Sequence, residues 1–191
     1  MLSNESDICP CRINPNAALS SKSINSDKGA FSYSECCQPL HLGSKVADTS
    51  EALMRSRYAA FVKVLPDYIL KTTLPAQQAY LDKQAIIEWA EQTHWSGLTI
   101  VYHNPKVSKR HAQVEFKAYY HDQQFGSPRL SAHHEVSTFV AVKDRKLWST
   151  EQSSQHHWYF LDPTTALNLS QKQPCICGSG EKFKRCCGQF V

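Results

Sequence analysis

The chain has 191 residues, of which 41% are hydrophobic and 20% charged, and its formal net charge is +4. This composition predicts a soluble globular protein with one domain-sized core and shorter appendages. No stretch approaches the roughly 20 consecutive apolar residues that a transmembrane helix needs, so such a helix is excluded. The first residues lack the pattern of a secretory signal. We therefore expect a cytoplasmic protein with reduced thiols, and so small a net charge does not by itself indicate nucleic-acid binding.

The first predicted element is a cysteine group near the N-terminus. Cys9 and Cys11 form a C-x-C corner, and Cys36 and Cys37 follow as an adjacent pair after 24 residues. The segment between them is rich in Ser and Asn without apolar periodicity, which is typical of a surface loop. His41, four residues beyond Cys37, is an alternative ligand if this group binds a metal.

Helices are expected in the segment that follows. Apolar residues recur with helical spacing over residues 50–65, and Asp48 as N-cap with Glu51 three residues later forms a capping box. A short helical turn is expected over 67–74, between two prolines, and a second long helix over 76–92.

Strands are expected after Gly97, where the apolar period changes from that of a helix to two. They are predicted at 98–103, 111–122, 130–142 and 156–162. Alternation in the third strand places two sets of side chains on opposite faces: Val136, Thr138, Val140 and Val142 on one, and Glu135, Ser137 and Phe139 on the other. Helices followed by consecutive strands predict an α+β fold with an antiparallel sheet.

The last predicted element is a second cysteine group that repeats the order of the first. Cys175 and Cys177 are followed, after eight residues, by Cys186 and Cys187, and 137 residues separate the two groups. Zinc binds four thiolates in a tetrahedron, and a structural zinc site has no open position. A C-x-C corner and an adjacent cysteine pair can each supply two sulfurs, so both groups are candidate zinc sites.

The residues between the C-terminal cysteines suit a metal cage. Gly178 and Gly180 allow a sharp turn that directs backbone amides at the sulfurs. A zinc ion with four thiolates carries a net charge of about −2, which Lys182, Lys184 and Arg185 are placed to offset. Disulfides fit less well because the chain shows no export signal, a redox site usually shows C-x-x-C, and iron could occupy the same sulfurs.

The C-terminal sequence CICGSGEKFKRCC closely resembles the SEC-C motif, the zinc-binding tail of the SecA preprotein translocase ATPase and of other bacterial proteins. By that pattern, the C-terminal zinc ligands are Cys175, Cys177, Cys186 and Cys187. The N-terminal group resembles a second copy, with CPC and YSECC in place, and implies Cys9, Cys11, Cys36 and Cys37 as ligands. Its linker is sixteen residues longer and lacks the Gly-Ser-Gly segment, which is expected to weaken this site.

A resemblance to the bacterial YchJ family covers nearly the whole chain. It rests on YSECCQPL, SEALMRSRYAAFV, WYFLD and the C-terminal SEC-C motif. The resemblance implies a central nuclear transport factor 2-like domain, in which a curved antiparallel sheet wraps around helices to form a cone with a pocket. The implied organisation is an N-terminal SEC-C-like knuckle at 1–47, the central domain at 48–170 and a C-terminal SEC-C knuckle at 171–191.

The candidate active-site residues in such a cone are Arg57, Glu115, His134, Glu135 and Ser137. Because adjacent residues of a strand point to opposite faces, His134 and Glu135 cannot both line one cavity. Glu115 is expected on a solvated face or as the partner of an arginine such as Arg57. The sequence therefore does not favour an enzyme.

Histidine pairs and aromatic residues are common in the second half of the chain. The pairs His133-His134 and His156-His157 lack a spaced histidine partner on the same element, and neighbours on a strand alternate between faces. They are therefore expected at the surface and not in a metal site. The aromatic side chains are expected in the core and in the wall of the cone: Trp95, Trp148, Trp158, Tyr102, Tyr119, Tyr120 and Tyr159.

Three functions are compatible with these features. In the first, a cytoplasmic zinc protein docks on another protein through its SEC-C knuckles, and the resemblance to SecA implies a link to protein export or quality control. In the second, the cone pocket is an enzymatic or small-molecule site and zinc is structural. In the third, the basic C-terminal knuckle binds nucleic acid, which the lack of basic residues along the strands disfavours. A homodimer is left open, and no membrane partner is expected.

Metal binding by thiolates also predicts a response to acid and to chelators. Each site must shed thiol protons to bind zinc. We expect acid or a strong chelator to loosen both chain ends while the central domain stays folded.

Overall fold

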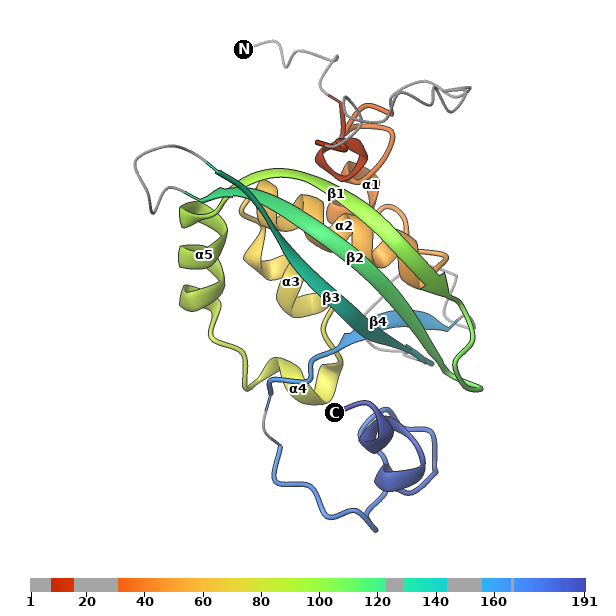
Figure 1. Cartoon of the computed structure of the whole chain (residues 1–191). Coiled ribbons are helices and arrows are strands. Elements are labelled where there is room, and N and C mark those ends of the chain that lie inside the picture. The colour runs from red at the N-terminus through yellow and green to blue at the C-terminus, as the bar shows by residue number, and fades with distance from the viewer. Residues whose placement is uncertain (1–7, 16–30, 123–128, 144–155, 166) are drawn as a thin grey trace.

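The computed structural model describes residues 8–15, 31–122, 129–143, 156–165 and 167–191. A four-stranded antiparallel sheet in the order β1-β2-β3-β4 curves around a group of helices (Figure 1). The strands are β1 His94–Asn104, β2 His111–Asp122, β3 Arg129–Val142 and β4 His157–Leu161. The helices are α1 Gln38–His41, α2 Ser50–Val62, α3 Pro66–Lys71, α4 Pro75–Gln78 and α5 Lys83–Gln92. Short 3₁₀ turns are η1 Pro10–Arg12, η3 Phe183–Arg185 and η4 Cys187–Gln189.

The start of α2 differs from the prediction by one residue. Thr49 is the N-cap, with extended backbone, and its hydroxyl accepts a hydrogen bond from the backbone N–H of Ala52 at 3.0 Å. The predicted capping box of Asp48 and Glu51 is therefore wrong. Glu51 instead accepts a hydrogen bond from Arg55, one helical turn away, at 2.8 Å.

The predicted helix at 76–92 is two helices in the structure. α4 ends after a single turn, and α5 begins at residue 83. Asp82 caps α5 by accepting hydrogen bonds from the backbone N–H groups of Gln84 and Ala85 at 2.9 and 3.1 Å. An aspartate at an N-cap favours the start of a new helix, because its side chain accepts hydrogen bonds from the free amides of the first turn.

The curvature of the sheet originates in β1. This strand begins at His94, before the predicted start, and its pairing with β2 shifts between Trp95 and Gly97 and again between Ile100 and Tyr102. Such β-bulges bend a strand and increase its twist. The pairing of β2 with β3 and of β3 with β4 runs without a shift in register.

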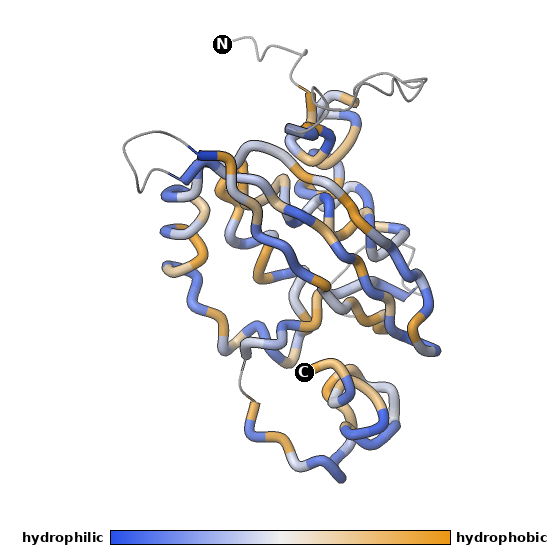
Figure 2. Tube along the Cα trace, in the orientation of Figure 1, coloured by the Kyte–Doolittle hydropathy of each residue, from blue (hydrophilic) through white to orange (hydrophobic). Residues whose placement is uncertain are grey.

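The main core lies between α2 and the concave face of the sheet. It includes Leu53 and Met54 from α2, Val114 and Phe116 from β2, and Phe139 from β3. Hydrophobic and hydrophilic residues alternate along the strands (Figure 2), as expected when successive side chains point to opposite faces.

A second core lies on the other face of the sheet, at the β3–β4 end. Val140, Tyr159 and Leu161 pack there with Leu74 and with Phe183 from the C-terminal segment. The two cysteine segments lie at opposite ends of the cone (Figure 1). None of the helices in the described part of the chain is long and apolar enough to cross a membrane.

Candidate metal centres and ligand pocket

The N-terminal cysteines meet in one cluster. η1 turns the chain between Cys9 and Cys11, and a turn before α1 presents Cys36 and Cys37. The Sγ atom of Cys11 lies 3.6 Å from each of the other three sulfurs, and the Sγ atoms of Cys36 and Cys37 are 3.9 Å apart. All four sulfurs lie within 4.8 Å of one another. Residues 16–30 of the long linker lie outside the described residues, so the surface loop stays a prediction.

The C-terminal cysteines form a second, fully buried cluster. The Sγ atom of Cys177 lies 3.6 Å from that of Cys175 and 3.5 Å from that of Cys186, and Cys187 completes the group. Gly178 and Gly180 have positive φ angles of 69° and 81°, which glycine adopts without strain. The predicted tight turn between the cysteines is therefore present.

The spacing of the sulfurs fits a tetrahedral metal. Four ligands at the Zn–S distance of about 2.3 Å place the sulfurs about 3.8 Å apart, close to the 3.5–3.9 Å between neighbouring sulfurs here. A disulfide needs about 2.0 Å, and all eight cysteines are free thiols. Both clusters are thus compatible with zinc.

The thiols of each cluster influence one another's ionisation. Hydrogen bonds from neighbouring thiols, from Cys11 and Cys177 first, lower the pKa of Cys36 and of Cys175. The hydrogen bond to Cys175 in turn raises the pKa of Cys187. One thiolate in each cluster therefore opposes ionisation of its neighbours, an opposition that a bound cation would relieve.

His41 is not a ligand of the N-terminal cluster. Its Nε2–H donates to the backbone carbonyl of Ser56 at 2.9 Å, and its Nδ1 accepts from the hydroxyl of Tyr33 at 2.8 Å. Both ring nitrogens are therefore occupied, and burial lowers the pKa of the ring. His41 joins the cysteine segment to α2.

The N-terminal cluster shares the main core. Three of its cysteines belong to the same buried group as Leu53 and Tyr58, and Arg55 of α2 donates to the carbonyl of Cys11 at 3.0 Å. The backbone N–H of Leu98 in β1 donates to the carbonyl of Ile13 at 2.8 Å. The segment is thereby fixed to both α2 and β1.

The C-terminal cluster packs on the second core. Its four cysteines and Phe183 are buried against Leu74, Val140 and Tyr159. His111 of β2 adds a direct contact, because its Nε2 lies 3.4 Å from the Sγ of Cys187. His111 was not among the predicted site residues, since no spacing rule links a strand residue to a cysteine 76 positions away.

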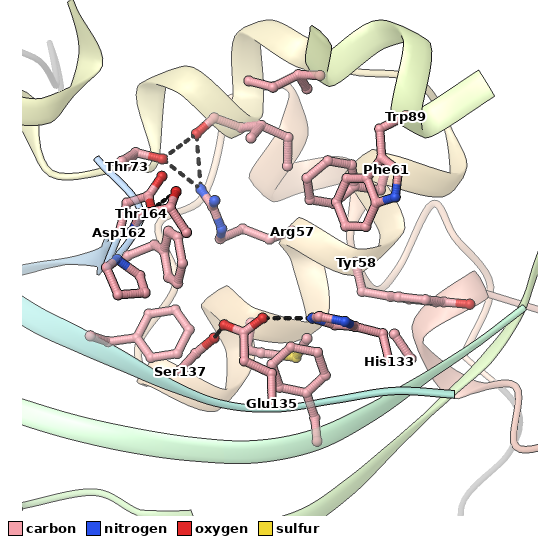
Figure 3. A pocket seen from close by; sticks show the side chains of 18 of the residues that line it. Arg57, Tyr58, Phe61, Thr73, Trp89, His133, Glu135, Ser137, Asp162 and Thr164 are labelled. Carbon is pink, nitrogen blue, oxygen red and sulfur yellow. Dashed lines mark hydrogen bonds and ion pairs between the residues drawn. The ribbon is translucent and has the colours of Figure 1, made fainter. Parts of the chain in front are cut away.

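A pocket of about 300 Å³ opens inside the cone. Its walls come from α2, α3, α5, all four strands and the chain after β4 (Figure 3). Its apolar lining consists mainly of aromatic side chains: Tyr58, Phe61, Trp89, Trp95, Phe116, Phe139 and Phe160. A small number of polar groups points into it, as in ordinary small-molecule sites.

Arg57 is the cation of this pocket. It is only 8% exposed, and its Nη1 donates to the carbonyl of Ile69 at 2.9 Å and to the hydroxyls of Thr72 and Thr73 at 2.7 and 3.2 Å. The guanidinium carbon lies 4.5 Å from the ring centre of Phe160. Burial lowers its pKa to about 10, so Arg57 remains charged at neutral pH, and it forms no ion pair with a described residue.

Glu135 is the second charged group in the pocket. Its carboxylate accepts hydrogen bonds from Ser137 and from Nε2 of His133, the latter at 2.8 Å (Figure 3). All three side chains line the pocket. The prediction that His134 and Glu135 cannot both line one cavity is confirmed, because Nε2 of His134 donates to Glu115 at 2.8 Å on the other face of the sheet.

Two family models match this chain. One describes the middle, nuclear transport factor 2-like domain of YchJ and matches residues 49–163. The other is the SEC-C motif, at residues 172–189. The chain belongs to the YchJ family.

Similar proteins have the same extent as this YchJ family chain. A UPF0225 protein of Actinobacillus succinogenes is 40% identical over 186 residues, which are 96% of this chain and 98% of that protein. A UPF0225 protein of Haemophilus influenzae strain Rd is 43% identical over 159 residues, 83% of this chain and 88% of that protein.

Two solved structures resemble this member of the YchJ family. A crystal structure of a SEC-C motif-containing protein from Psychrobacter arcticus is 52% identical, covers 98% of both chains and has a TM-score of 0.84. A solution structure of a SEC-C motif-containing protein from Rhodopseudomonas palustris is 28% identical, covers 70% of this chain and 91% of that one, and has a TM-score of 0.55. The cone described above is the nuclear transport factor 2-like domain that the sequence implied.

The structure decides several residue predictions for this YchJ family chain. Of the two alternatives for Glu115 the solvated face is confirmed, because Glu115 lies on the outer face of β2 with His134 and does not pair with Arg57. His133 is 47% exposed, as expected, although it also lines the pocket, whereas His157 is buried at 2% exposure and contradicts the expectation of a surface residue. Tyr102 is 61% exposed and does not belong to the core.

The burial of the described residues tests the other aromatic and histidine predictions. Tyr119 and Tyr159 are buried and Trp95 and Trp158 pack against the main core, as expected. Tyr120 is half-buried, and His156 is exposed. Trp148 lies outside the described residues.

Proposed function

We propose that this protein is a zinc-stabilised binding protein whose cone pocket holds a small molecule with an apolar body and a polar head group. The single observation that carries this proposal is Arg57, a buried cation without an ion pair among the described residues, in the wall of an aromatic pocket. Removing an ion from water costs several kcal/mol unless a partner compensates. A bound molecule that accepts hydrogen bonds from Arg57 would supply this compensation.

In this proposal each cysteine cluster binds one zinc ion. The ligands are Cys9, Cys11, Cys36 and Cys37 at one site, and Cys175, Cys177, Cys186 and Cys187 at the other. Four thiolates close the coordination shell, so the zinc has no open position for a substrate. The clusters then act as structural supports at the two ends of the cone. Reduced thiols of this kind suit the cytoplasm, which we propose as the compartment.

The pocket is tested with prodan, an uncharged naphthalene dye whose emission shifts in apolar surroundings. We expect saturable binding to the natural protein, and at least a tenfold weaker affinity for Ala118→Phe, because Ala118 lines the pocket and the added ring occupies it. Val136→Phe adds the same ring at a position that does not line the pocket and is 54% exposed, so it should bind prodan normally.

Thermal unfolding of each variant shows whether it is folded. If Ala118→Phe does not fold, Ile86→Trp, which blocks the pocket from α5, takes its place. The proposal is wrong if the natural protein binds no prodan, or if the filled variants bind it as well as the natural protein does.

A second candidate function is docking of an acidic protein surface on the C-terminal knuckle, as the SEC-C resemblance implied. Lys182, Lys184 and Arg185 are exposed around the buried cluster. Arg185 also lines a groove of about 400 Å³ together with Lys109 and Arg110 from the β1–β2 connection. Such a surface attracts negatively charged partners.

This second candidate is tested with a fluorescent hexaglutamate peptide. The double variant Lys184→Glu, Arg185→Glu should bind it at least tenfold more weakly than the natural protein. The control double variant Lys45→Glu, Arg129→Glu makes the same charge change at exposed positions elsewhere. Equal affinity of both variants would exclude docking at the knuckle, and tighter binding of a single-stranded oligonucleotide than of the peptide would favour nucleic acid.

A further inference from the structure

The polar end of the pocket contains one cation, Arg57, and two carboxylates, Glu135 and Asp162, and Arg57 forms no ion pair with either. Arg57 uses only Nη1 toward the described residues, so Nε and Nη2 remain as donors. Glu135 already accepts hydrogen bonds from His133 and Ser137 on its two oxygens. Asp162 lines the same pocket and forms no ion pair with Arg57. Each oxygen of Glu135 already accepts one hydrogen bond, whereas Oδ2 of Asp162 accepts none from a described residue, so Arg57 and Asp162 are the pair with the most capacity for a ligand.

Asp162 is held in a fixed position. Its Oδ1 accepts hydrogen bonds from the backbone N–H and the hydroxyl of Thr164 at 2.8 and 2.7 Å. The buried side-chain amide of Gln77 binds both backbone groups of Asp162, donating to the carbonyl at 2.7 Å and accepting from the N–H at 3.0 Å. Oδ2 has no donor among the described residues, so it remains a preorganised acceptor.

Aromatic rings form the rest of the pocket. The ring centres of Phe61 and Trp89 are 4.8 Å apart, and those of Trp89 and Trp95 are 5.2 Å apart, both in edge-to-face arrangement. Phe139 and Phe160 pack at 5.9 Å on the other side. Aromatic walls of this kind favour a flat ring as the ligand body.

A head group of either charge would be opposed in this setting. A carboxylate attracted to Arg57 would be repelled by Asp162 and Glu135, and an ammonium attracted to Asp162 would be repelled by Arg57. Either ion would also lose its hydration in an apolar cavity, which is costly without full pairing. A neutral group that accepts from Arg57 and donates to Asp162 satisfies both side chains without this cost.

We infer that the cone pocket binds an uncharged, flat aromatic molecule whose head group is an amide or lactam, with its carbonyl on Arg57 and its N–H on Asp162. This inference rests on the proposed function and assigns the chemical class of the ligand. An amide presents an acceptor and a donor side by side. It can therefore bridge two side chains that form no ion pair with each other.

Three naphthalene probes of the same size test this class: 2-naphthamide, 2-naphthoate and 2-naphthylmethylamine. Their affinities are measured by calorimetry or by quenching of tryptophan fluorescence, since Trp89 and Trp95 line the pocket. We expect the amide to bind at least tenfold more tightly than either charged probe.

Charge-changing variants then test the two assigned side chains. Asp162→Asn keeps the Oδ1 acceptor for Thr164 but removes the negative charge. The affinity for naphthoate should therefore rise at least tenfold relative to the affinity for the amide. Arg57→Met should shift the ranking toward the amine. Glu115→Gln also removes one carboxylate charge, but from the outer face of β2, and should leave the ranking unchanged.

The possible failures are distinguishable. If naphthoate or the amine binds the natural protein best, or if Asp162→Asn and Glu115→Gln have equal effects, the inferred ligand class is wrong while the proposed pocket function stands. If none of the probes binds saturably and prodan does not bind either, the proposed function fails as well.

Discussion

The imidazole of His111, on β2, lies with its Nε2 3.4 Å from the Sγ of Cys187, in the C-terminal cysteine cluster. The hydroxyl of Ser108 lies 2.7 Å from Nδ1. If Cys187 is a thiolate, its sulfur can only accept, so Nε2–H is the donor to it and Nδ1 accepts from Ser108. The ring of Phe190 packs on the imidazole with its centre 4.6 Å away. The sheet thus orients a sulfur of a cluster whose four cysteines all come from the tail of the chain.

This contact predicts that His111 supports metal binding at one site only. His111→Ala should lower the zinc affinity of the C-terminal cluster about 10- to 100-fold, because a hydrogen bond to a ligand orients it and tunes its basicity. His111→Gln, which retains an N–H donor, should restore part of the loss.

Zinc transfer to a chromogenic chelator measures this effect. His134→Ala removes a histidine from the exposed outer face and should change neither site. Equal zinc release from His111→Ala and the natural protein would show that the 3.4 Å contact contributes nothing to the metal.

Metal removal is expected to destabilise the whole cone. The sequence predicted that a chelator would loosen only the chain ends, but the N-terminal cysteines share the main core and the C-terminal ones pack on the second core. Loss of zinc should therefore lower the free energy of unfolding by more than about 4 kcal/mol, the range typical of a lost structural metal.

Metal content and denaturant unfolding together check this prediction. The natural protein should contain two zinc ions per chain, and Cys9→Ser and Cys175→Ser one each. Chelator-treated protein that keeps a cooperative transition at the natural midpoint would contradict the shared-core interpretation.

The fold followed from local patterns in the sequence, and its errors are local as well. Alternation placed β2 correctly over its full length, because a half-buried strand has a strict period of two. The start of α2 was misplaced because Asp48, Thr49 and Ser50 are all good N-caps, and only the backbone conformation decides among them. Asp82 is a good N-cap residue and could have indicated a new helix start within 76–92. The apolar residues of this segment nevertheless fitted one continuous helix.

The candidate site was predictable only where its residues are neighbours in sequence. Cysteine spacing identified both clusters, because a C-x-C corner followed by an adjacent cysteine pair occurs twice, across 8 residues in one group and 24 in the other. Arg57 and Asp162 come from α2 and from the chain after β4, and only the closed cone brings them to one cavity. Tertiary packing brings Arg57 and Asp162 to the same pocket, and no sequence motif predicts that they lie close together.

His41 predicts a pH dependence of stability. Burial is the main cause that lowers its pKa from the ordinary 6.5, so below pH 6.5 the unfolded chain binds a proton that the folded chain does not. Stability from His41 is therefore complete above pH 6.5 and is lost as the pH falls toward the lower, folded pKa, by up to about 1.4 kcal/mol per pH unit. His41→Gln, which keeps a donor for Ser56, should flatten this slope.

Denaturant midpoints measured from pH 5.5 to 7.5, with zinc present throughout, give the slope. His134→Gln is the control, because its side chain is half exposed on the outer face. The assignment fails if His41→Gln and His134→Gln leave the same slope as the natural protein.

Arg57 is expected to serve binding more than folding. Arg57→Met removes three hydrogen bonds made by Nη1, which lowers the free energy of unfolding. It also removes a buried charge without an ion pair, which raises the free energy of unfolding by a similar amount. We therefore expect the free energy of unfolding to change by no more than about 1 kcal/mol, while the affinity for 2-naphthamide falls at least tenfold. Arg55→Met, on the same helix but outside the pocket lining, should bind the probe normally. A large loss of stability in Arg57→Met with unchanged probe affinity would instead make Arg57 a structural residue.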